Sequence, residues 1–392
     1  MSEWKNCTIS DLGNIIGGAT PSTKNPAYYD GGEIPWITPK DLAGFQGRFI
    51  SHGERNITEA GLRSCSAQML PAHTILFSSR APIGYIAIAA NSVCTNQGFK
   101  SVIPNDNTDY LFLYYLMKYY KHVIEGMGSG TTFKEVSAAT MREIKVRVPK
   151  EKRDQHRIAA FLSTLDDKIE NNNQINKNLF QQLFVLFNNI YSSNGCSVTE
   201  LGSLCTFQEG YVNPPQNHPE FFDGAIKWLR AVDINESFIL STSRTLTQVG
   251  FHSAKKSAYL FSPNTIAISK SGTIGRLGII SDFMCGNRAV INIAPNISKY
   301  LPFIYSYLKN RQEEFPNLAV GSVQKNLYIS LLEPLKVQMP EAEILNQFCD
   351  IGNAILGAIK NNCFENLRLR NLRDTLLPRL MSGELDVSNL DL

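Results

Sequence analysis

The chain has 392 residues, of which 43% are hydrophobic and 19% charged, and its formal net charge is +3. This length exceeds the range in which one hydrophobic core keeps growing, so two or more domains are expected. The sequence has neither a charged-then-apolar leader nor a run of about 18 apolar residues. We therefore expect neither export nor a membrane-spanning helix, and we predict a cytoplasmic protein.

The eight cysteines are spread singly, without the Cys-x-x-Cys pairs or Cys/His spacing that tetrahedral zinc needs, so reduced thiols and no metal site are expected. The positive charge is concentrated in two segments. Residues 1–150 hold 15 Lys+Arg against 12 Asp+Glu, and residues 196–340 hold 13 against 10. The segments 151–195 and 341–392 show no such excess, with 5 against 5 and 5 against 8. This distribution favours two globular parts that face phosphates, but a solvated mixed surface explains so small an excess equally well.

The two halves of the chain repeat each other at an offset of about 190 residues. The segment 7–13 returns as 196–202, and Trp36 with Asp41 returns as Trp228 with Asp233. The order is kept through Cys94 and Asn96, which correspond to Cys285 and Asn287. The chain is therefore internally duplicated, and a protein with two related sites usually reads a target with two halves.

The first part of each repeat mixes short β-rich runs, at 74–78 and 265–269, with Gly, Pro and Asn turns. Each copy also has one aromatic-rich helical stretch, at 110–120 and 300–310. This pattern predicts a mixed α/β globule. Tyr114, Tyr115 and Tyr119 could stack on bases, but aromatic residues at helical spacing more often belong to a core.

The second part of each repeat is a long helix, in which apolar residues recur in steps of four and three, as in the seam of a coiled coil. A helix of 35 to 40 residues spans about 55 to 60 Å. We expect the two helices to pair antiparallel as a spacer, with one globule at each end and a pseudo-twofold axis between them. The predicted seam comprises Ile158, Phe161, Leu165, Ile169, Asn172, Leu179 and Leu186 in the first copy and Ile344, Phe348, Ile351, Ile355, Ala358, Asn362, Glu365, Leu369, Leu372 and Leu376 in the second.

Asn172 and Asn362 occupy matching positions in this seam. A buried polar residue there costs stability but can specify register and partner number. Simple exposure to solvent is the alternative.

Two short motifs suggest catalysis, and both are weak. Asn213-Pro214-Pro215-Gln216 resembles the loop with which amino-methylating DNA enzymes hold a flipped base, but the aromatic fourth residue is missing, so we interpret it as a Pro-rich turn. Glu143-Ile144-Lys145 resembles part of a metal-dependent nuclease site, but no well-placed carboxylate pair precedes it and Pro334 replaces Glu143 in the second copy. We therefore predict that the chain is not itself an enzyme.

A pair of polar loops in each copy is the better candidate site. The segments 78–84 and 269–276 follow a strand and combine small residues with cations, and 128–134 is matched by 321–325. Small residues allow close backbone approach to phosphates, and Arg80 or Arg276 can reach guanine in a major groove. A plain glycine turn is the alternative for each loop, but the same pairing in both copies favours contact with DNA.

The whole chain resembles the specificity subunits of type I restriction-modification systems. The resemblance rests on the duplicated globule and helix, the Trp36…Asp41 and Trp228…Asp233 segments, the run Ile-Ser-Lys-Ser-Gly-Thr-Ile-Gly at 268–275, and the ending at 376–385. The first copy departs from it in having Arg80-Ala81-Pro82 where the second has Ser271-Gly272-Thr273.

The resemblance implies an α+β protein with two target recognition domains, at 1–150 and 196–340, spacer helices at 151–195 and 341–380, and a tail at 381–392. It further implies that the chain binds a bipartite, asymmetric double-stranded DNA target and recruits two methylation subunits and the restriction subunits. S-adenosylmethionine, ATP and Mg²⁺ are then expected in those partners and no cofactor in this chain. The alternatives are a self-sufficient DNA adenine methyltransferase and a protein scaffold that does not bind DNA.

Two sets of residues are predicted to carry this function. The helix residues expected in spacing and subunit docking are Ile158, Leu165, Asn172, Leu179, Phe348, Ile355, Asn362 and Leu369. The residues expected to contact DNA are Lys40, Ser78, Arg80, Thr131, Lys134, Arg230, Lys270, Ser271, Arg276, Gln324 and Lys325.

Overall fold

The computed structural model describes residues 3–130, 134–191, 197–322 and 324–386. The chain forms two compact units. Unit 1 comprises residues 1–170 and 368–392, so it takes segments from both ends of the chain, and unit 2 comprises residues 171–367.

The described strands of unit 1 form three sheets. Their strand orders are β2-β9-β6-β7-β4, β5-β3-β8 and β1-β10. The five-stranded sheet is antiparallel except for its edge strand β4, which runs parallel to β7. The strands are β1 (Trp4–Thr8), β2 (Gly13–Gly17), β3 (Ile34–Ile37), β4 (Phe49–Ile50), β5 (Arg55–Ile57), β6 (Ile75–Ser79), β7 (Ile83–Ala89), β8 (Cys94–Thr95), β9 (Lys100–Pro104) and β10 (Lys145–Pro149).

Unit 2 repeats this topology strand for strand. Its sheets have the orders β12-β19-β16-β17-β14, β15-β13-β18 and β11-β20. The same parallel edge pair recurs between β14 and β17. The predicted internal repeat is therefore confirmed. The strands are β11 (Ser197–Glu200), β12 (Cys205–Glu209), β13 (Phe222–Leu229), β14 (Phe238–Ile239), β15 (Thr245–Leu246), β16 (Ile266–Ser269), β17 (Leu277–Ile280), β18 (Cys285–Gly286), β19 (Val290–Pro295) and β20 (Lys336–Met339).

Two helices of 40 residues each follow β10 and β20, and the remaining helices are short. The aromatic-rich stretches form α2 and α8, and Tyr114 and Tyr115 of α2 are buried in the core, as predicted. The helices are α1 (Glu59–Arg63), α2 (Tyr110–Tyr119), α3 (Lys121–Gly126), α4 (Ala138–Glu143), α5 (Lys152–Tyr191), α6 (Leu201–Leu204), α7 (Gln248–His252), α8 (Leu301–Asn310), α9 (Phe315–Leu318), α10 (Ile329–Leu332) and α11 (Ala342–Met381).

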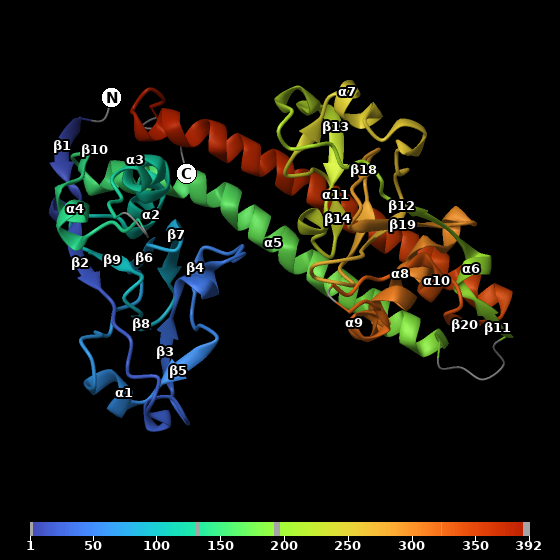
Figure 1. Ribbon diagram of the computed structural model, residues 1–392. Helices are drawn as coiled ribbons and strands as arrows, with labels where there is room; N and C mark the ends of the chain where they lie inside the picture. Colours follow the sequence, from blue (N-terminus) through green and yellow to red (C-terminus); the bar gives the residue numbers. More distant parts are fainter. Residues whose placement is uncertain (1–2, 131–133, 192–196, 323, 387–392) are drawn as a thin grey trace. The chain divides into compact units, whose positions relative to one another are not determined.

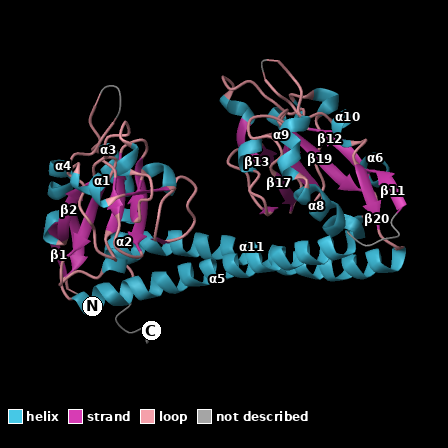
Figure 2. Cartoon of the chain, turned by 90° about the horizontal axis from the view of Figure 1, so that it is seen from below, coloured by secondary structure: helices cyan, strands magenta, loops and turns pink. Residues whose placement is uncertain are grey.

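Each long helix contributes to the cores of both units. The first turns of α5 pack in the core of unit 1 through Ile158 and Leu162, whereas Leu183 and Phe187 near its end pack in the core of unit 2. The helix α11 does the reverse: its beginning packs in unit 2, and Leu377, Leu380 and Met381 complete the core of unit 1. Within each unit a stretch of α5 lies beside a stretch of α11 (Figures 1 and 2).

The two helices run antiparallel. In unit 2, Asn172 contacts Asn366 and Asn176 contacts Asn362, so partner numbers fall as residue numbers rise. In unit 1, Asp166 pairs with Arg373 in the same sense. The predicted architecture of mixed α/β globules with long antiparallel helices is therefore confirmed.

The predicted seam is wrong in detail, by about one residue in α11. Ile344, Ile351 and Leu372 are exposed, and the helix instead buries Leu345 and Leu356. The reason is that each helix packs against a globule as well as against the other helix, which widens and rotates its buried face. The eight residues predicted for docking also face inward, because Ile158, Asn172 and Phe348 are buried and Leu165, Leu179, Ile355, Asn362 and Leu369 are half-buried.

A layer of asparagines joins α5 to α11 within unit 2. Asn172 Nδ2 donates to Asn366 Oδ1 over 2.9 Å and to Glu365 Oε2 over 2.7 Å. Asn366 Nδ2 donates to Asn173 Oδ1, and Asn362 Nδ2 donates to Asn176 Oδ1 over 2.8 Å. Asn172 and Asn362 therefore both bond across the helix pair, each with its own partner. Such a polar layer favours one register, because a shift would leave buried amides without partners.

Replacing Asn366 with leucine is expected to lower the free energy of unfolding by about 2 kcal/mol, because Asn173 then loses its partner in the layer and Asn172 keeps only its bond to Glu365. The double change Asn172→Leu with Asn366→Leu should recover part of this loss, since both partners become apolar. Urea unfolding followed by circular dichroism measures both effects. The control is Asn361→Leu, at an exposed position of the same helix; equal losses in Asn366→Leu and the control would contradict a structural role of the layer.

The described cysteines are free thiols, and Cys94, Cys205, Cys285 and Cys349 are buried. Burial raises the pKa of each of these four thiols to about 12, so they stay protonated and inert near neutral pH. Among the described residues, no helix is both long and apolar enough to cross a membrane.

Candidate nucleic-acid interface

Three turns of unit 1 meet at the end of strand β6. Ser79 N donates to Gly98 O over 2.7 Å, which joins β6 to the turn 96–99. Val136 N donates to Ser79 O over 3.0 Å, which joins β6 to the hairpin that begins at Ser129. This hairpin is closed by two backbone bonds between Ser129 and Glu135. The described residues of the segments 79–84, 96–99 and 128–135 are called the recognition turns of unit 1.

Unit 2 builds the same arrangement with the same backbone bonds. Lys270 N donates to Ala289 O over 2.7 Å, and Leu327 N donates to Lys270 O over 2.9 Å. The hairpin is closed between Val320 and Asn326. The recognition turns of unit 2 are therefore 270–275, 287–289 and 320–326, and the two loops that the sequence singles out in each copy do lie together.

The serine at the end of each strand holds its turn and does not face outward. Ser78 is fully buried, and its hydroxyl donates to Pro82 O over 2.8 Å and accepts from Tyr85 N over 2.7 Å. Ser269 is equally buried, and it bonds to Thr273 O and Arg276 N in the same way. The prediction that the Ser78 side chain contacts DNA is therefore corrected, because its hydroxyl is already used inside the turn.

The hairpins present exposed polar side chains. Gly130 and Gly321 have φ of 127° and 137°, and a Cβ on Gly321 would lie 2.3 Å from Gln324 O, so the hairpin needs glycine there. Lys134 in unit 1, and Gln324 with Lys325 in unit 2, are exposed. Among the described residues none forms an ion pair with either lysine. Thr131, also predicted to contact DNA, lies outside the described residues.

Two of the predicted cations at the turns, Arg80 and Lys270, are engaged by carboxylates. Lys270 Nζ lies 2.8 Å from Glu209 Oε1 and over the Tyr328 ring, and its side chain is 13% exposed. Arg80 lies 3.4 Å from Glu135. Lys270 is therefore corrected from a DNA contact to an anchor of the strand end, because a desolvated, paired ammonium has little left to offer a phosphate.

The tryptophan–aspartate segments mainly hold the backbone beside the turns. Trp36 Nε1 donates to Ala19 O over 3.1 Å, and Trp228 Nε1 donates to Val212 O over 2.8 Å. Within these segments Lys40 forms an exposed ion pair with Glu54. Both indoles therefore fasten a neighbouring backbone segment in the same way.

Arg230 is the second predicted residue in these segments. Its guanidinium lies over the Trp228 ring, it bonds to Ser243, and its Nε is 3.7 Å from Asp233. Arg230 is therefore largely held by its own loop.

Sequence reasoning missed Gln97 and Arg288, which occupy equivalent exposed positions on the third recognition turn. Gln97 accepts a hydrogen bond from the Thr20 hydroxyl. Arg288 precedes Ala289, which is bonded to Lys270. The sequence does contain a signal for both residues: because Asn96 corresponds to Asn287, the next residues, Gln97 and Arg288, also correspond.

Ser271 and Arg276 lie on the same edge of unit 2, and both are half-buried. No carboxylate among the described residues forms an ion pair with Arg276 or Arg288. Among the described residues at the turns of unit 2, the cations without an ion pair are therefore the half-buried Arg276 and the exposed Arg288 and Lys325, whereas the turns of unit 1 present Lys134 and Gln97.

The two weak catalytic motifs form ordinary structure. Gln216 donates to Pro214 O and accepts from Arg244, so it closes its own loop. Glu143 ends α4, Ile144 is buried and Lys145 begins β10. Across the residues that the structure describes, no three His, Cys, Asp or Glu side chains gather as metal ligands would.

Known proteins resemble the chain over nearly its whole length. The family model "Type I restriction modification DNA specificity domain" matches residues 1–181 and again 194–362. The MjaIX specificity subunit of a type I restriction enzyme of Methanocaldococcus jannaschii is 33% identical, with 99% of this chain and 95% of the relative aligned. The EcoR124I/EcoR124II specificity subunit of Escherichia coli is 30% identical over 42% of this chain and 41% of its own length.

A solved structure supports the fold. The type I restriction-modification S subunit of M. genitalium superimposes with a TM-score of 0.59 at 17% identity, covering 97% of this chain and 96% of that one. The family match and the full-length relative agree with the duplicated turns. The chain belongs to the family of type I restriction modification DNA specificity domains.

Proposed function

We propose that this chain is the DNA specificity subunit of a type I restriction-modification complex and that each unit reads one half of a bipartite target. The observation that carries the proposal is the duplicated set of recognition turns, joined by the same backbone bonds in both units. Rigid, matching frames that present different side chains are what two related but unequal half-sites require. The target should be asymmetric, because Gln97 in one unit corresponds to Arg288 in the other.

We propose that the chemistry belongs to partner subunits. Two methylation subunits would bind S-adenosylmethionine, and restriction subunits would use ATP and Mg²⁺. Since the target is genomic DNA, we place the complex in the cytoplasm. We propose a docking surface formed by exposed apolar side chains of the two long helices, and not by the inward-facing residues predicted for docking. Its residues are Ile175, Val185, Ile344, Ile351, Phe364 and Leu372.

A map of methylated adenines tests this function directly. Cells that express the chain together with a methylation subunit should gain methylation at one new bipartite, asymmetric motif, which cells without the chain lack. The absence of new methylation despite a soluble, assembled complex would contradict the proposal and favour a scaffold. S-adenosylmethionine binding by the isolated chain would instead favour a self-sufficient methyltransferase.

Arg276→Ala should relax one base position of the half-site read by unit 2, by about tenfold in discrimination, because alanine cannot form the bidentate hydrogen bonds of arginine with guanine. The half-site read by unit 1 should be unchanged. Competition binding with single-base variants of the target measures both. Lys336→Ala is the control, since Lys336 is exposed on β20 and paired with Glu200; unchanged discrimination at every position would remove Arg276 from the base-reading residues.

A further inference from the structure

The two units differ at a pair of equivalent lysines. Lys309 on α8 corresponds to Lys118 on α2, each six residues after the phenylalanine that the two helices share. Lys309 Nζ lies 3.0 Å from Glu236 Oε2, and Gln312 Nε2 donates to Glu236 Oε1 over 3.1 Å. In unit 2 one carboxylate therefore neutralises the lysine and holds its neighbour.

Unit 1 lacks that carboxylate. Ile88 N donates to Arg48 O and Ile279 N donates to Ser237 O, so Arg48 and Ser237 are equivalent. The residue before each is Gly47 in unit 1 and Glu236 in unit 2. The residue three beyond the lysine is Lys121 in unit 1, where unit 2 has Gln312. At this place, unit 1 therefore has one acidic residue fewer and one cationic residue more than unit 2.

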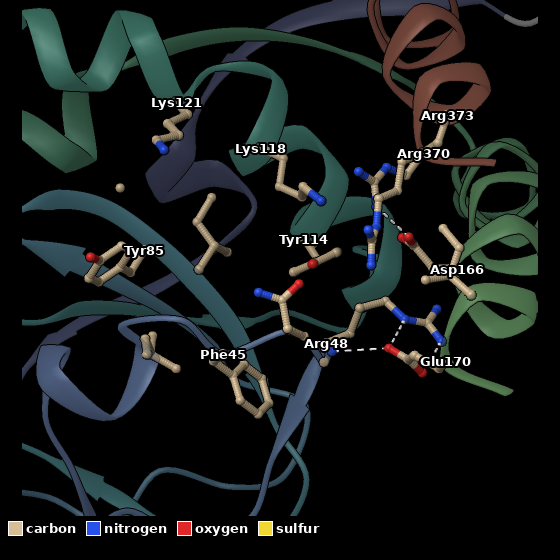
Figure 3. A pocket seen from close by; sticks show the side chains of 16 residues that line it. Phe45, Arg48, Tyr85, Tyr114, Lys118, Lys121, Asp166, Glu170, Arg370 and Arg373 are labelled. Atoms are coloured by element: carbon tan, nitrogen blue, oxygen red, sulfur yellow. Dashed lines mark hydrogen bonds and ion pairs between the residues drawn. The ribbon is translucent and has the colours of Figure 1, made fainter. Parts of the chain in front are cut away.

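Gly47, Lys118 and Lys121 line a hollow of about 430 Å³ in unit 1, shown in Figure 3. Its acidic side chains are already engaged: Asp166 by Arg373 and by the Tyr115 hydroxyl, and Glu170 by Arg48. The cationic residues that line it come from β4 and its flank, α2, α3, and α11: Arg48, Lys118, Lys121, Arg370 and Arg373.

Two of these cations have no acidic partner. Among the described residues, no carboxylate forms a hydrogen bond or ion pair with Lys118 or Arg370, whereas Lys121 has Glu125, 3.6 Å away on its own helix. Lys118 extends from α2 toward the arginine side chains of α11 (Figure 3). Burial, and then the charge of Arg373, lower the pKa of Lys118, whereas the charges of Asp166 and Asp374 act in the opposite direction.

We propose that the hollow of unit 1 binds a phosphate group in the role that the Glu236 carboxylate plays in unit 2. A guanidinium fork and two ammonium groups around one hollow match a multiply charged oxyanion, and arginine pairs with phosphate through two parallel hydrogen bonds. Phe45 and Tyr85 also line the hollow, so it can hold the remainder of a phosphate-bearing molecule. The phosphate comes either from a free nucleotide or inorganic phosphate, or from a DNA backbone.

The test is thermal unfolding and calorimetry of the full chain with inorganic phosphate, against chloride at equal ionic strength. Phosphate should raise the unfolding midpoint of the wild type and bind roughly tenfold more weakly to Lys118→Met and to Arg370→Gln, each of which removes one charge from the site. The matched controls are Lys309→Met, in the neutralised copy, and Arg368→Gln, exposed two residues before Arg370. Both controls should bind phosphate as the wild type does.

A second readout needs no ligand. Lys118→Met should stabilise the phosphate-free chain, because it removes a half-buried charge that forms no ion pair with any described residue, whereas Lys309→Met should destabilise it, because Glu236 then keeps only the Gln312 amide as a partner. Equal phosphate effects in all four variants, or no effect in the wild type, would overturn the proposal. So would destabilisation by Lys118→Met, provided that circular dichroism shows a folded chain.

Two further measurements distinguish the sources of the phosphate. Weaker binding of AMP or ATP by the two site variants, with unchanged DNA affinity, identifies a free phosphate ligand. Weaker DNA binding with a shallower salt dependence identifies a DNA backbone phosphate. The phosphate titration contains neither DNA nor a methylation subunit, so its failure leaves the proposed function standing.

Discussion

Replacing Arg48 with methionine is expected to lower the free energy of unfolding of unit 1 by about 3 kcal/mol. Arg48 is 4% exposed and lies just before β4. Its guanidinium pairs with Glu170 and Asp167, and it donates to Ser163 over 2.8 Å, so one side chain fastens the loop to α5. Because Asp167 is mostly exposed, the carboxylates left behind are partly solvated, and the loss stays near the lower end for a broken buried pair.

Urea unfolding measures this loss, and Lys40→Met is its control. Lys40 also forms an ion pair, with Glu54, but both side chains are exposed, so its removal should cost less than about 1 kcal/mol. Similar losses in the two variants would mean that burial does not strengthen the Arg48 cluster. Glu170→Gln should also destabilise the chain, because the buried guanidinium of Arg48 then pairs with one carboxylate, that of Asp167, and no longer with two.

Removing Lys134 and Lys325 together is expected to weaken DNA binding about 100-fold at 0.1 M salt, roughly tenfold for each phosphate that is no longer neutralised by a lysine. Both lysines are exposed and directly precede a closing residue of equivalent hairpins, and no described residue forms an ion pair with either. The slope of log affinity against log salt should become shallower by about two. Discrimination between target and non-target sequences should change little, because phosphate contacts carry no base information.

Fluorescence anisotropy over a salt series measures this effect. Lys5→Ala removes an equally exposed lysine from β1, which belongs to a separate two-stranded sheet, and it should leave the salt slope unchanged. An unchanged slope in the double variant would show that the hairpins do not reach phosphates.

Much of the fold can be predicted from the sequence because the sequence contains the same pattern in two copies. The offset of about 190 residues aligns Gly130 with Gly321 and Lys134 with Lys325, and the structure closes both hairpins one residue outside these positions. Short β-rich runs, and apolar residues in steps of four and three, suffice to predict strands and long helices. The register of the helix seam was not predictable to one residue. The buried face of each helix also depends on the globule against which it packs, and the apolar pattern of the helix alone does not define that contact.

The polar side chains were harder to assign for a related reason. Lys270 finds Glu209, 61 residues earlier in the chain, and Arg48 finds Glu170, 122 residues later. No local sequence pattern indicates such distant pairs. A cation that forms an ion pair therefore cannot be distinguished in the sequence from one that does not. Ser78 was mistaken for a contact because small residues in a turn suit both a ligand and the turn itself.

Because unit 1 draws Leu377, Leu380 and Met381 into its core, its completion must wait until these residues have been synthesised. Unit 2 lies uninterrupted between residues 171 and 367, so it can close first, while the ribosome still holds the last turns of α11. A chain released prematurely near residue 367 would contain a finished unit 2 and a unit 1 with open apolar surface, which proteases and chaperones recognise. Incomplete chains would thus be removed before a protein with one working half could enter a complex.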